Sequence, residues 1–346
     1  QPVCFLRGSE VSPQTLLKKS PIGPQATGAF LLCNTFFAVV LVTSPARVQA
    51  GPFLTKDQNP FTLVYGQPLP TPARLPQAEE FSYATSLEIT NTLNAESDAN
   101  ESLYVDFEAY NLTLGGIYGL NDRWALKLDI PFIYRSGGVF DHAIDEWHKL
   151  FSLPRSSRPD VEDHQFNLFY SRNGVTGIDM NTSQAGIADA QLGLGHSLLQ
   201  TPEHAISLWA AIDLPAGNAD DLTGNDDLDY SLWLAGSSII DAMSMLDTNI
   251  GIVLPGDSVL TGLETEDLVF FGHAGAHFAL NPTFTLKLQL AGHSGYYKDT
   301  DLDFLGSAMI LIFGGSINTG KCSAIDVGFS EDIKAGASPD IGLLIS

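Results

Sequence analysis

The sequence of 346 residues predicts an all-β fold. The specific architecture is a transmembrane antiparallel up-and-down β-barrel of about 12 strands, with one short amphipathic helix in a long outer loop. Three observations lead to this prediction. Many segments alternate apolar and polar residues with period two, as strands with two different faces do. Short and long connections alternate along the chain, and only 16% of the residues are charged although 44% are hydrophobic.

The charge balance excludes one class of partner. The chain carries 40 Asp and Glu against 17 Lys and Arg, a net charge of −23. Nucleic acid is therefore not expected as a partner, because no basic stripe is available to displace counterions from phosphates. Aromatic residues make up 10% of the chain, which argues against a disordered protein.

The first 50 residues have the pattern of an export signal. The apolar run AFLLCNTFFAVVLVT occupies 29–43, with Lys18 and Lys19 upstream and Val48-Gln49-Ala50 at its end. We expect cleavage after Ala50. The alternative is a membrane anchor, but a spanning helix needs about 20 apolar residues. Cleavage would leave Cys322 alone, so no intrachain disulfide is expected.

Residues 51–80 form a second segment. It contains six prolines, so we expect an extended lead-in rather than a strand or a helix. Within a narrow barrel of about twelve strands, either this lead-in or the helix in the outer loop would fill the interior.

The barrel is predicted to occupy 81–346. Its strands are expected near 81–93, 103–120, 123–136, 184–199, 204–216, 227–240, 245–255, 266–280, 283–297, 302–317, 321–332 and 338–346. Short turns are expected at 121–122, 200–203, 241–244, 281–282 and 318–320, and the long outer loop 136–183 contains the helix and an extra hairpin at 164–182. The last strand ends in Ile341 to Ser346, whereas barrel proteins usually end in an aromatic residue that the assembly machinery recognises.

The alternation also assigns the two faces of the strands. Trp124, Leu126 and Leu128 share an apolar face, as do Phe284 and the three leucines that follow it at every second position. The opposite face is expected to line a polar lumen with Lys127, Asp129, Asp189, Asp213, Asp229, His273, His277 and Lys287. Near strand ends, aromatic residues are candidates for interfacial girdles: Tyr83, Tyr118, Trp124, Tyr134, Tyr230 and Tyr296. A soluble exported β-sandwich would show similar alternation and is the structural alternative.

An ordered set of short motifs carries a family resemblance. The motifs are DQNP (57–60), YGLNDRW (118–124), GGVFD (137–141), IDEWH (144–148), LP (153–154), GIAD (186–189) and LPAGNADDL (214–222). Over roughly 51–315 the chain resembles a family of uncharacterised Gram-negative proteins predicted to be outer-membrane β-barrels. The resemblance implies location and fold, and no activity is attached to that family.

The outer loop offers weak candidates for chemistry. Phe140, Ile144, Trp147 and Phe151 make an apolar helical stripe, which would serve as a plug or lie at the membrane interface. Asp141, Asp145 and His148 follow the same spacing on a polar face and are the only catalytic candidates, although an ordinary solvated helix face is the favoured explanation.

A second acidic loop is a candidate cation site. Asp220, Asp221, Asp226 and Asp227 supply oxygen ligands at a density that suits divalent cations, but their spacing does not match an EF-hand. A solvated acidic loop is the favoured interpretation. No cofactor is expected beyond structural divalent cations at such loops, which would bridge to anionic lipid headgroups. His273 and His277 allow a metal or proton site. A water-filled or hydrogen-bonded polar lumen is the favoured explanation of these two histidines.

The sequence therefore predicts an integral protein of the outer membrane, with a passive porin-like or structural role. Its expected partners are outer-membrane lipid, lipopolysaccharide and the barrel assembly machinery. One alternative is an outer-membrane enzyme acting on lipid or surface substrates. The other is a soluble periplasmic β-sandwich that binds a ligand.

Overall fold

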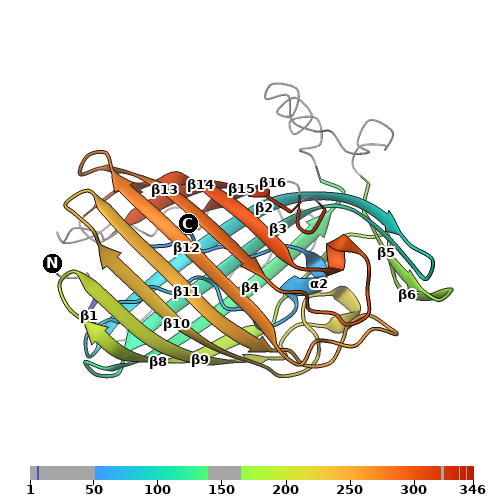
Figure 1. Ribbon diagram of the computed structural model, residues 1–346, viewed down its shortest axis with the longest axis horizontal. Coiled ribbons are helices and arrows are strands. Elements are labelled where there is room, and N and C mark those ends of the chain that lie inside the picture. Colours follow the sequence, from blue (N-terminus) through green and yellow to red (C-terminus); the bar gives the residue numbers. More distant parts are fainter. Residues whose placement is uncertain (1–5, 8–50, 139–164, 321–322, 335, 340) are drawn as a thin grey trace, which may run out of the picture.

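A single closed β-barrel dominates the structure (Figure 1). The computed structural model describes residues 6–7, 51–138, 165–320, 323–334, 336–339 and 341–346. Within them, twelve antiparallel strands form the barrel wall: β2 (Glu80–Ser97), β3 (Glu101–Gly119), β4 (Trp124–Ser136), β8 (Ala190–Gln200), β9 (His204–Leu214), β10 (Asp229–Ile239), β11 (Ser244–Leu254), β12 (Val269–Ala279), β13 (Phe284–His293), β14 (Ala308–Asn318), β15 (Ala324–Asp332) and β16 (Ile341–Ile345).

The wall closes because β2 has a neighbour on each side. It pairs with β3 from Phe81↔Tyr118 to Ser97↔Ser102, and with β16 from Ile341↔Asn91 to Ile345↔Leu87. The remaining wall strands pair with their neighbours in chain order, β4 meeting β8. A closed ring satisfies the backbone groups of every strand, so no sheet edge faces the membrane.

Several smaller elements lie outside this ring. β5 (Asn167–Arg172) and β6 (Val175–Met180) form a hairpin, and β5 pairs with residues 101–106 at the start of β3. β7 (Gln184–Ile187) pairs with residues 132–135 near the end of β4. Two single-turn 3₁₀ helices lie in loops, at Ala219–Asp221 and Asp303–Leu305, and β1 (Leu6–Arg7) pairs with the start of β2. No helix among the described residues is long and apolar enough to cross a membrane.

The two ends of the barrel differ. One end carries tight turns at 120–123, 201–203, 240–243 and 280–283, and is called the turn end below. The other carries the longer connections at 215–228, 255–268 and 294–307, together with the described parts of the connections that follow β4 and β15 and the short turn 98–100 between β2 and β3, and is called the loop end.

The outer face is apolar. Phe284, Leu286, Leu288 and Leu290 of β13 all point outward and are exposed, whereas Lys287 and Gln289 between them are buried inside. Tyr83, Tyr118 and Trp124 are exposed at the turn end, and Tyr134 and Tyr230 are exposed toward the loop end. This arrangement is that of a membrane-spanning barrel, with an apolar band flanked by aromatic residues.

The structure confirms the predicted fold class and the number of strands, and the β-sandwich alternative is wrong. Tyr296 is the exception among the girdle residues, because it is completely buried inside the barrel. The predicted helix of the outer loop, with its stripe Phe140, Ile144, Trp147 and Phe151, lies outside the described residues. The extra hairpin of that loop is present as β5 and β6.

Candidate functional site

The lumen is occupied by the chain's own N-terminal segment. Residues 51–79 enter the barrel from the turn end as two limbs, and the turn between them lies at the loop end (Figure 1). We call this segment the plug. Its apex is a single helical turn, α2 (Pro60–Leu63), so the expectation of a wholly extended lead-in is wrong over four residues. Asn59 caps this turn by accepting a hydrogen bond from Phe61 N at 3.0 Å, and Pro60 suits the first helical position because it needs no backbone donor.

Side-chain amides of the wall hold the plug's backbone. Gln289 accepts from Phe53 N at 2.8 Å and donates to Phe53 O at 3.2 Å. Asn249 makes the same pair of bonds to Thr71, at 2.7 and 3.1 Å. The plug belongs to no sheet, so its buried backbone groups require such partners. Inside the barrel the wall therefore holds the plug's backbone through side chains, and a backbone bond to a wall strand occurs at the end of the plug, where Glu79 N donates to Gly119 O at 2.8 Å.

A third backbone contact fixes the second limb close to the wall. Gly66 N donates to Asp229 Oδ2 at 2.8 Å, and Gln191 donates to Gly66 O at 3.1 Å. A Cβ atom at residue 66 would lie 2.7 Å from the Cβ of Asp229, so only glycine allows this approach.

Apolar side chains close the loop end around α2. Tyr65 stacks on Tyr296 with ring centroids 5.0 Å apart, and Phe61 meets Phe304 edge to face at 6.0 Å. Tyr297 donates to Phe61 O at 2.7 Å. Burial raises the pKa of the Tyr296 and Tyr297 hydroxyls well above the usual value, so both remain neutral. Loop 294–307 thus folds inward onto the plug, which explains why Tyr296 is not a girdle residue.

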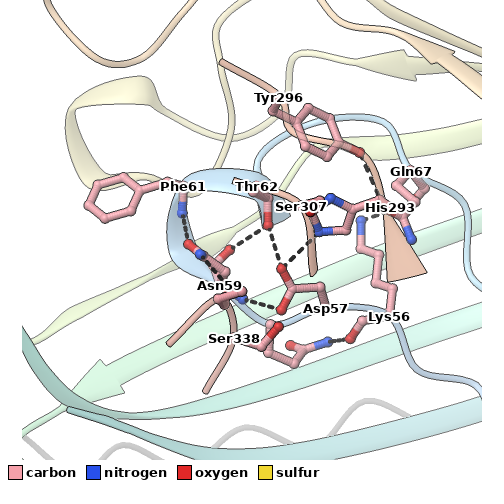
Figure 2. A network of polar contacts seen from close by, with 12 residues as sticks. Lys56, Asp57, Asn59, Phe61, Thr62, Gln67, His293, Tyr296, Ser307 and Ser338 are labelled. Carbon is pink, nitrogen blue, oxygen red and sulfur yellow. Dashed lines mark hydrogen bonds and ion pairs between the residues drawn. The ribbon is translucent and has the colours of Figure 1, made fainter. Parts of the chain in front are cut away.

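A polar cluster anchors the apex beneath this apolar cap (Figure 2). Asp57 Oδ2 lies 3.0 Å from His293 Nε2 and accepts from the Thr62 hydroxyl at 3.0 Å. His293 Nδ1 lies 2.8 Å from Ser294 O, so both ring nitrogens face oxygen acceptors. His293 therefore links Asp57 of the plug to the backbone at the point where β13 ends. Asn59 donates to the carbonyls of Phe304 and Ala337, linking the apex to two further outer segments.

All eight lumen-facing residues named from the sequence are buried on the inner face. The structure joins several of them into pairs. Lys127 forms an ion pair with its neighbour Asp129, and Lys287 Nζ lies 2.6 Å from Asp326 and over the ring of Phe53.

His273 and His277 both bind one carboxylate, that of Asp247. The His273 Nε2 to Asp247 Oδ1 distance is 2.7 Å. Sequence reasoning missed Asp247, although it lies on the inward face of a period-two segment. Among the described residues, no group of three or more His, Cys, Asp or Glu side chains is arranged to hold a metal ion.

The acidic residues at the loop end bind backbone groups. Asp189 accepts from Ala216 N, Gly217 N and Asn225 N, at 2.7–3.2 Å. Asp229 accepts from Gly256 N at 2.6 Å, in addition to the hydrogen bond that it accepts from Gly66 N of the plug. These carboxylates therefore fold the outer loops over the lumen.

The other acidic candidates are more peripheral. Asp226 accepts from Ala219 N, and Asp227 accepts from Asp257 N, at 3.2 and 3.1 Å. Asp220 is exposed and Asp221 is half-buried. Divalent binding at these four residues stays a prediction. The catalytic candidates Asp141, Asp145 and His148 lie outside the described residues, so the enzymatic hypothesis also stays a prediction.

The plug leaves two adjacent cavities beside β2, β3 and β4. Their volumes are about 60 and 100 Å³, and both border Leu54, Leu69, Ser86, Thr113 and Asp129. The first extends toward Thr223 at the loop end, and the second toward Ser82 and Ile117 near the turn end. Each has room for a few water molecules.

Comparisons with known proteins agree with this architecture. A family model described as "Protein of unknown function (DUF3187)" matches residues 29–346. The search of curated proteins returned no match.

Solved structures with a similar fold include the COG4313 outer membrane channel from Pseudomonas putida F1. It shares 13% sequence identity at a TM-score of 0.51, over 78% of this chain and 94% of that chain. The NanC porin has 10% identity and a TM-score of 0.43, over 76% of this chain and 97% of its own. The P. putida toluene transporter TodX has 12% identity and a TM-score of 0.37, over 77% of this chain and 76% of its own. The first of these supports the barrel fold.

Proposed function

The chain belongs to the DUF3187 family, and we propose that it is an outer-membrane channel for passive transport of small polar solutes, gated by its N-terminal plug. One observation carries this proposal. The same strands present apolar side chains outward and charged side chains inward, and the space inside is filled by a segment that is not part of the wall. A barrel with a removable filling is able to conduct, whereas one packed by its own wall residues is not.

The location follows from the same proposal. Export through the leader at 1–50, with cleavage after Ala50, would leave Gly51 at the start of the plug's first limb. The turn end then faces the periplasm, and the loop end faces outward, as in other barrels of this type. The apolar belt would contact outer-membrane lipid and lipopolysaccharide after insertion by the barrel assembly machinery.

The plug can be removed without cutting the wall. A variant that lacks residues 52–73 keeps every barrel strand and the leader, and is compared with the wild type in planar lipid bilayers. We expect small or brief currents from the wild type and steady, larger currents from the deletion variant, because the plug fills most of the lumen.

A gel assay verifies that each protein is folded before its currents are compared. Unboiled barrels migrate differently from boiled ones, and both proteins must show that shift. A folded, inserted deletion variant that carries no current would overturn the proposal and favour a structural envelope role.

A further inference from the structure

The wall holds the second limb of the plug by its main chain. Asn249 bonds both the N–H and the C=O of Thr71. Asp229 accepts from the N–H of Gly66, and Gln191 donates to its C=O. We call each such pair of bonds a clamp. Gly66 has no side chain, and the hydroxyl of Thr71 bonds back to the limb's own backbone at 3.0 Å, so both clamps hold a main chain regardless of its side chains.

Prolines suit the limb to these clamps. They stand at 68, 70 and 72, so that two of them flank Thr71. A proline-rich chain carries few N–H groups, and therefore crosses a lumen without leaving many buried donors unpaired. A free peptide of this kind is already extended in water, so it loses little conformational entropy on binding.

The limb leaves space between the two clamps. Both cavities beside the plug border Leu69, and their volumes are about 60 and 100 Å³. A different side chain at this position therefore has room beside the wall. The site fixes the backbone at two points and tolerates variation between them.

The charge of the wall adds a second requirement. Lys56 of the first limb is attracted by the carboxylates of Asp213 and Asp229, which are 7% and 0% exposed. Its Nζ donates to Gln67 O at 2.9 Å, next to the clamp at Gly66. Buried carboxylates that lose a cation are costly, so a ligand that replaces the plug must supply a positive charge.

We propose that the lumen binds short, extended, proline-containing peptides that carry a basic residue. The second limb of the plug occupies this site as a built-in competitor. Passage of such peptides through the barrel rests on the proposed channel function, whereas their binding does not.

Binding is measured by the fluorescence anisotropy of a labelled peptide of residues 64–73, VYGQPLPTPA. The proteins are the full chain and the variant that lacks 52–73, each verified by the gel assay. We expect binding to the deletion variant and about a hundredfold weaker binding to the full chain, because the tethered plug competes at a high effective concentration. Equal binding to both proteins, or none to the deletion variant, would overturn the proposal.

A full-length protein replaces the deletion variant if that variant fails the gel assay. A Cβ atom at residue 66 would lie 2.7 Å from the Cβ of Asp229, so Gly66→Val displaces the second limb while every strand is kept. The peptide should bind this protein more tightly than the wild type. Equal affinities would overturn the proposal.

Recognition of the main chain is tested by methylating one peptide nitrogen. Methylation at Thr71 removes the N–H that Asn249 accepts, and should weaken binding by about tenfold, as an unpaired buried polar group does. Asn249→Leu in the deletion variant should weaken the parent peptide to a similar extent and add little loss for the methylated one. Additive losses would overturn this clamp as the binding site.

Two controls accompany this measurement. Methylation at Leu69, whose N–H donates to no wall side chain in the described part of the chain, should leave the affinity unchanged. Asn318→Leu should do the same. An equal loss on methylation at either position would overturn recognition through the clamp.

The charge requirement is tested with two further peptides. The Gln67→Lys peptide should bind about tenfold or more tightly than the Gln67→Glu peptide, since charges about 4 Å apart interact strongly even at an effective dielectric constant of about 20. Equal affinities would overturn the need for a basic residue.

Passage is measured by release of the unlabelled Gln67→Lys peptide from lipid vesicles that contain the deletion variant. We expect faster release than from vesicles without protein. Binding without release, from a variant that conducts ions, would overturn peptide transport while the channel function stands. Absence of any current from the folded deletion variant would overturn the channel function, while peptide binding would still support the site.

Discussion

At the scale of single residues, three tight turns share one solution. The Oδ1 atoms of Asn121, Asp241 and Asn281 each accept the backbone N–H groups of the second and third residues that follow, which are Arg123 and Trp124, Met243 and Ser244, and Thr283 and Phe284. The distances are all 2.8–3.0 Å. Asn and Asp favour turns because their short side chains make such local bonds. These turns were predictable because the interaction is contained within four residues.

Asp241 makes its turn sensitive to pH. The N–H of Met243 holds the pKa of this carboxyl below its ordinary value, and the N–H of Ser244 adds to the effect. A lowered pKa in the folded state means that the stabilisation is complete above the ordinary value of about 3.9 and is lost as the pH falls through the lower, folded value. We expect wild-type stability to fall on such acidification more than that of Asp241→Asn, which keeps an acceptor that does not titrate.

The measurement is the temperature at which the unboiled gel mobility changes to the boiled one, at pH 7 and at about pH 3. Asp241→Ala should have a lower temperature at pH 7 than either other protein. An identical acid response in the wild type and in Asp241→Asn would contradict the assignment.

The lumen residues show what a period-two sequence pattern predicts and what it does not. Period two places Asp213 and His277 on the inner face, because successive side chains on a strand point to opposite sides. It does not tell which inward residues meet, since that depends on the register between strands. The pairing of Asp57 with His293, 236 residues apart, was therefore not predictable. Tyr296 was misassigned because it lies in a loop that folds inward, where the strand period no longer applies.

At the scale of elements, the plug explains why the composition of residues 51–79 differs from the rest. Proline offers no backbone donor, so a proline-rich limb does not pair with the wall as an extra strand. The expectation that the lead-in would fill the barrel came from the narrow interior alone. The side-chain clamps that hold it could not be foreseen, because they join Phe53 and Thr71 to strands more than 170 residues away.

The clamp at Asn249 should control how often the plug opens. Asn249→Leu removes both bonds to Thr71 and leaves the N–H and C=O of Thr71 without partners. An unpaired buried polar group costs about 1–3 kcal/mol, so the plugged state should lose stability relative to the open one. We expect more frequent openings in single-channel recordings of this variant.

Asn318→Leu is the matched control for that experiment. Asn318 also donates from its side-chain amide, to Pro282 O at 2.8 Å, but it lies half-buried at the turn end and makes no hydrogen bond to the plug. It should leave the opening frequency at the wild-type level. Equal changes in both variants would indicate a general loosening of the barrel instead of release of the plug.

At the scale of the whole molecule, closure and strand number were predictable because every strand repeats one rule. Each strand is apolar on one side and polar on the other, and an even number of antiparallel strands returns the chain to the turn end. Because the prediction rests on the same alternation in many strands, a wrong assignment of a single residue does not change the predicted fold. What lies inside the ring obeys no repeat, which is why α2 and the inward loops emerge only from the structure.

The same rule predicts a dependence of stability on depth in the membrane. Leu288 lies in the middle of β13 and Phe284 at its turn end, and both point outward with nearly half of their surface exposed. A lysine at the centre of the bilayer costs about 2–4 kcal/mol, and one near the interface about 0–1 kcal/mol. We expect Leu288→Lys to lower the free energy of unfolding by that larger amount relative to Leu288→Ala, and Phe284→Lys to differ little from Phe284→Ala. Urea titrations in lipid vesicles measure all four, and the alanine variants separate the cost of the charge from the loss of apolar contact. Equal lysine penalties at the two positions would mean that β13 does not span the membrane, and the channel proposal would fail with it.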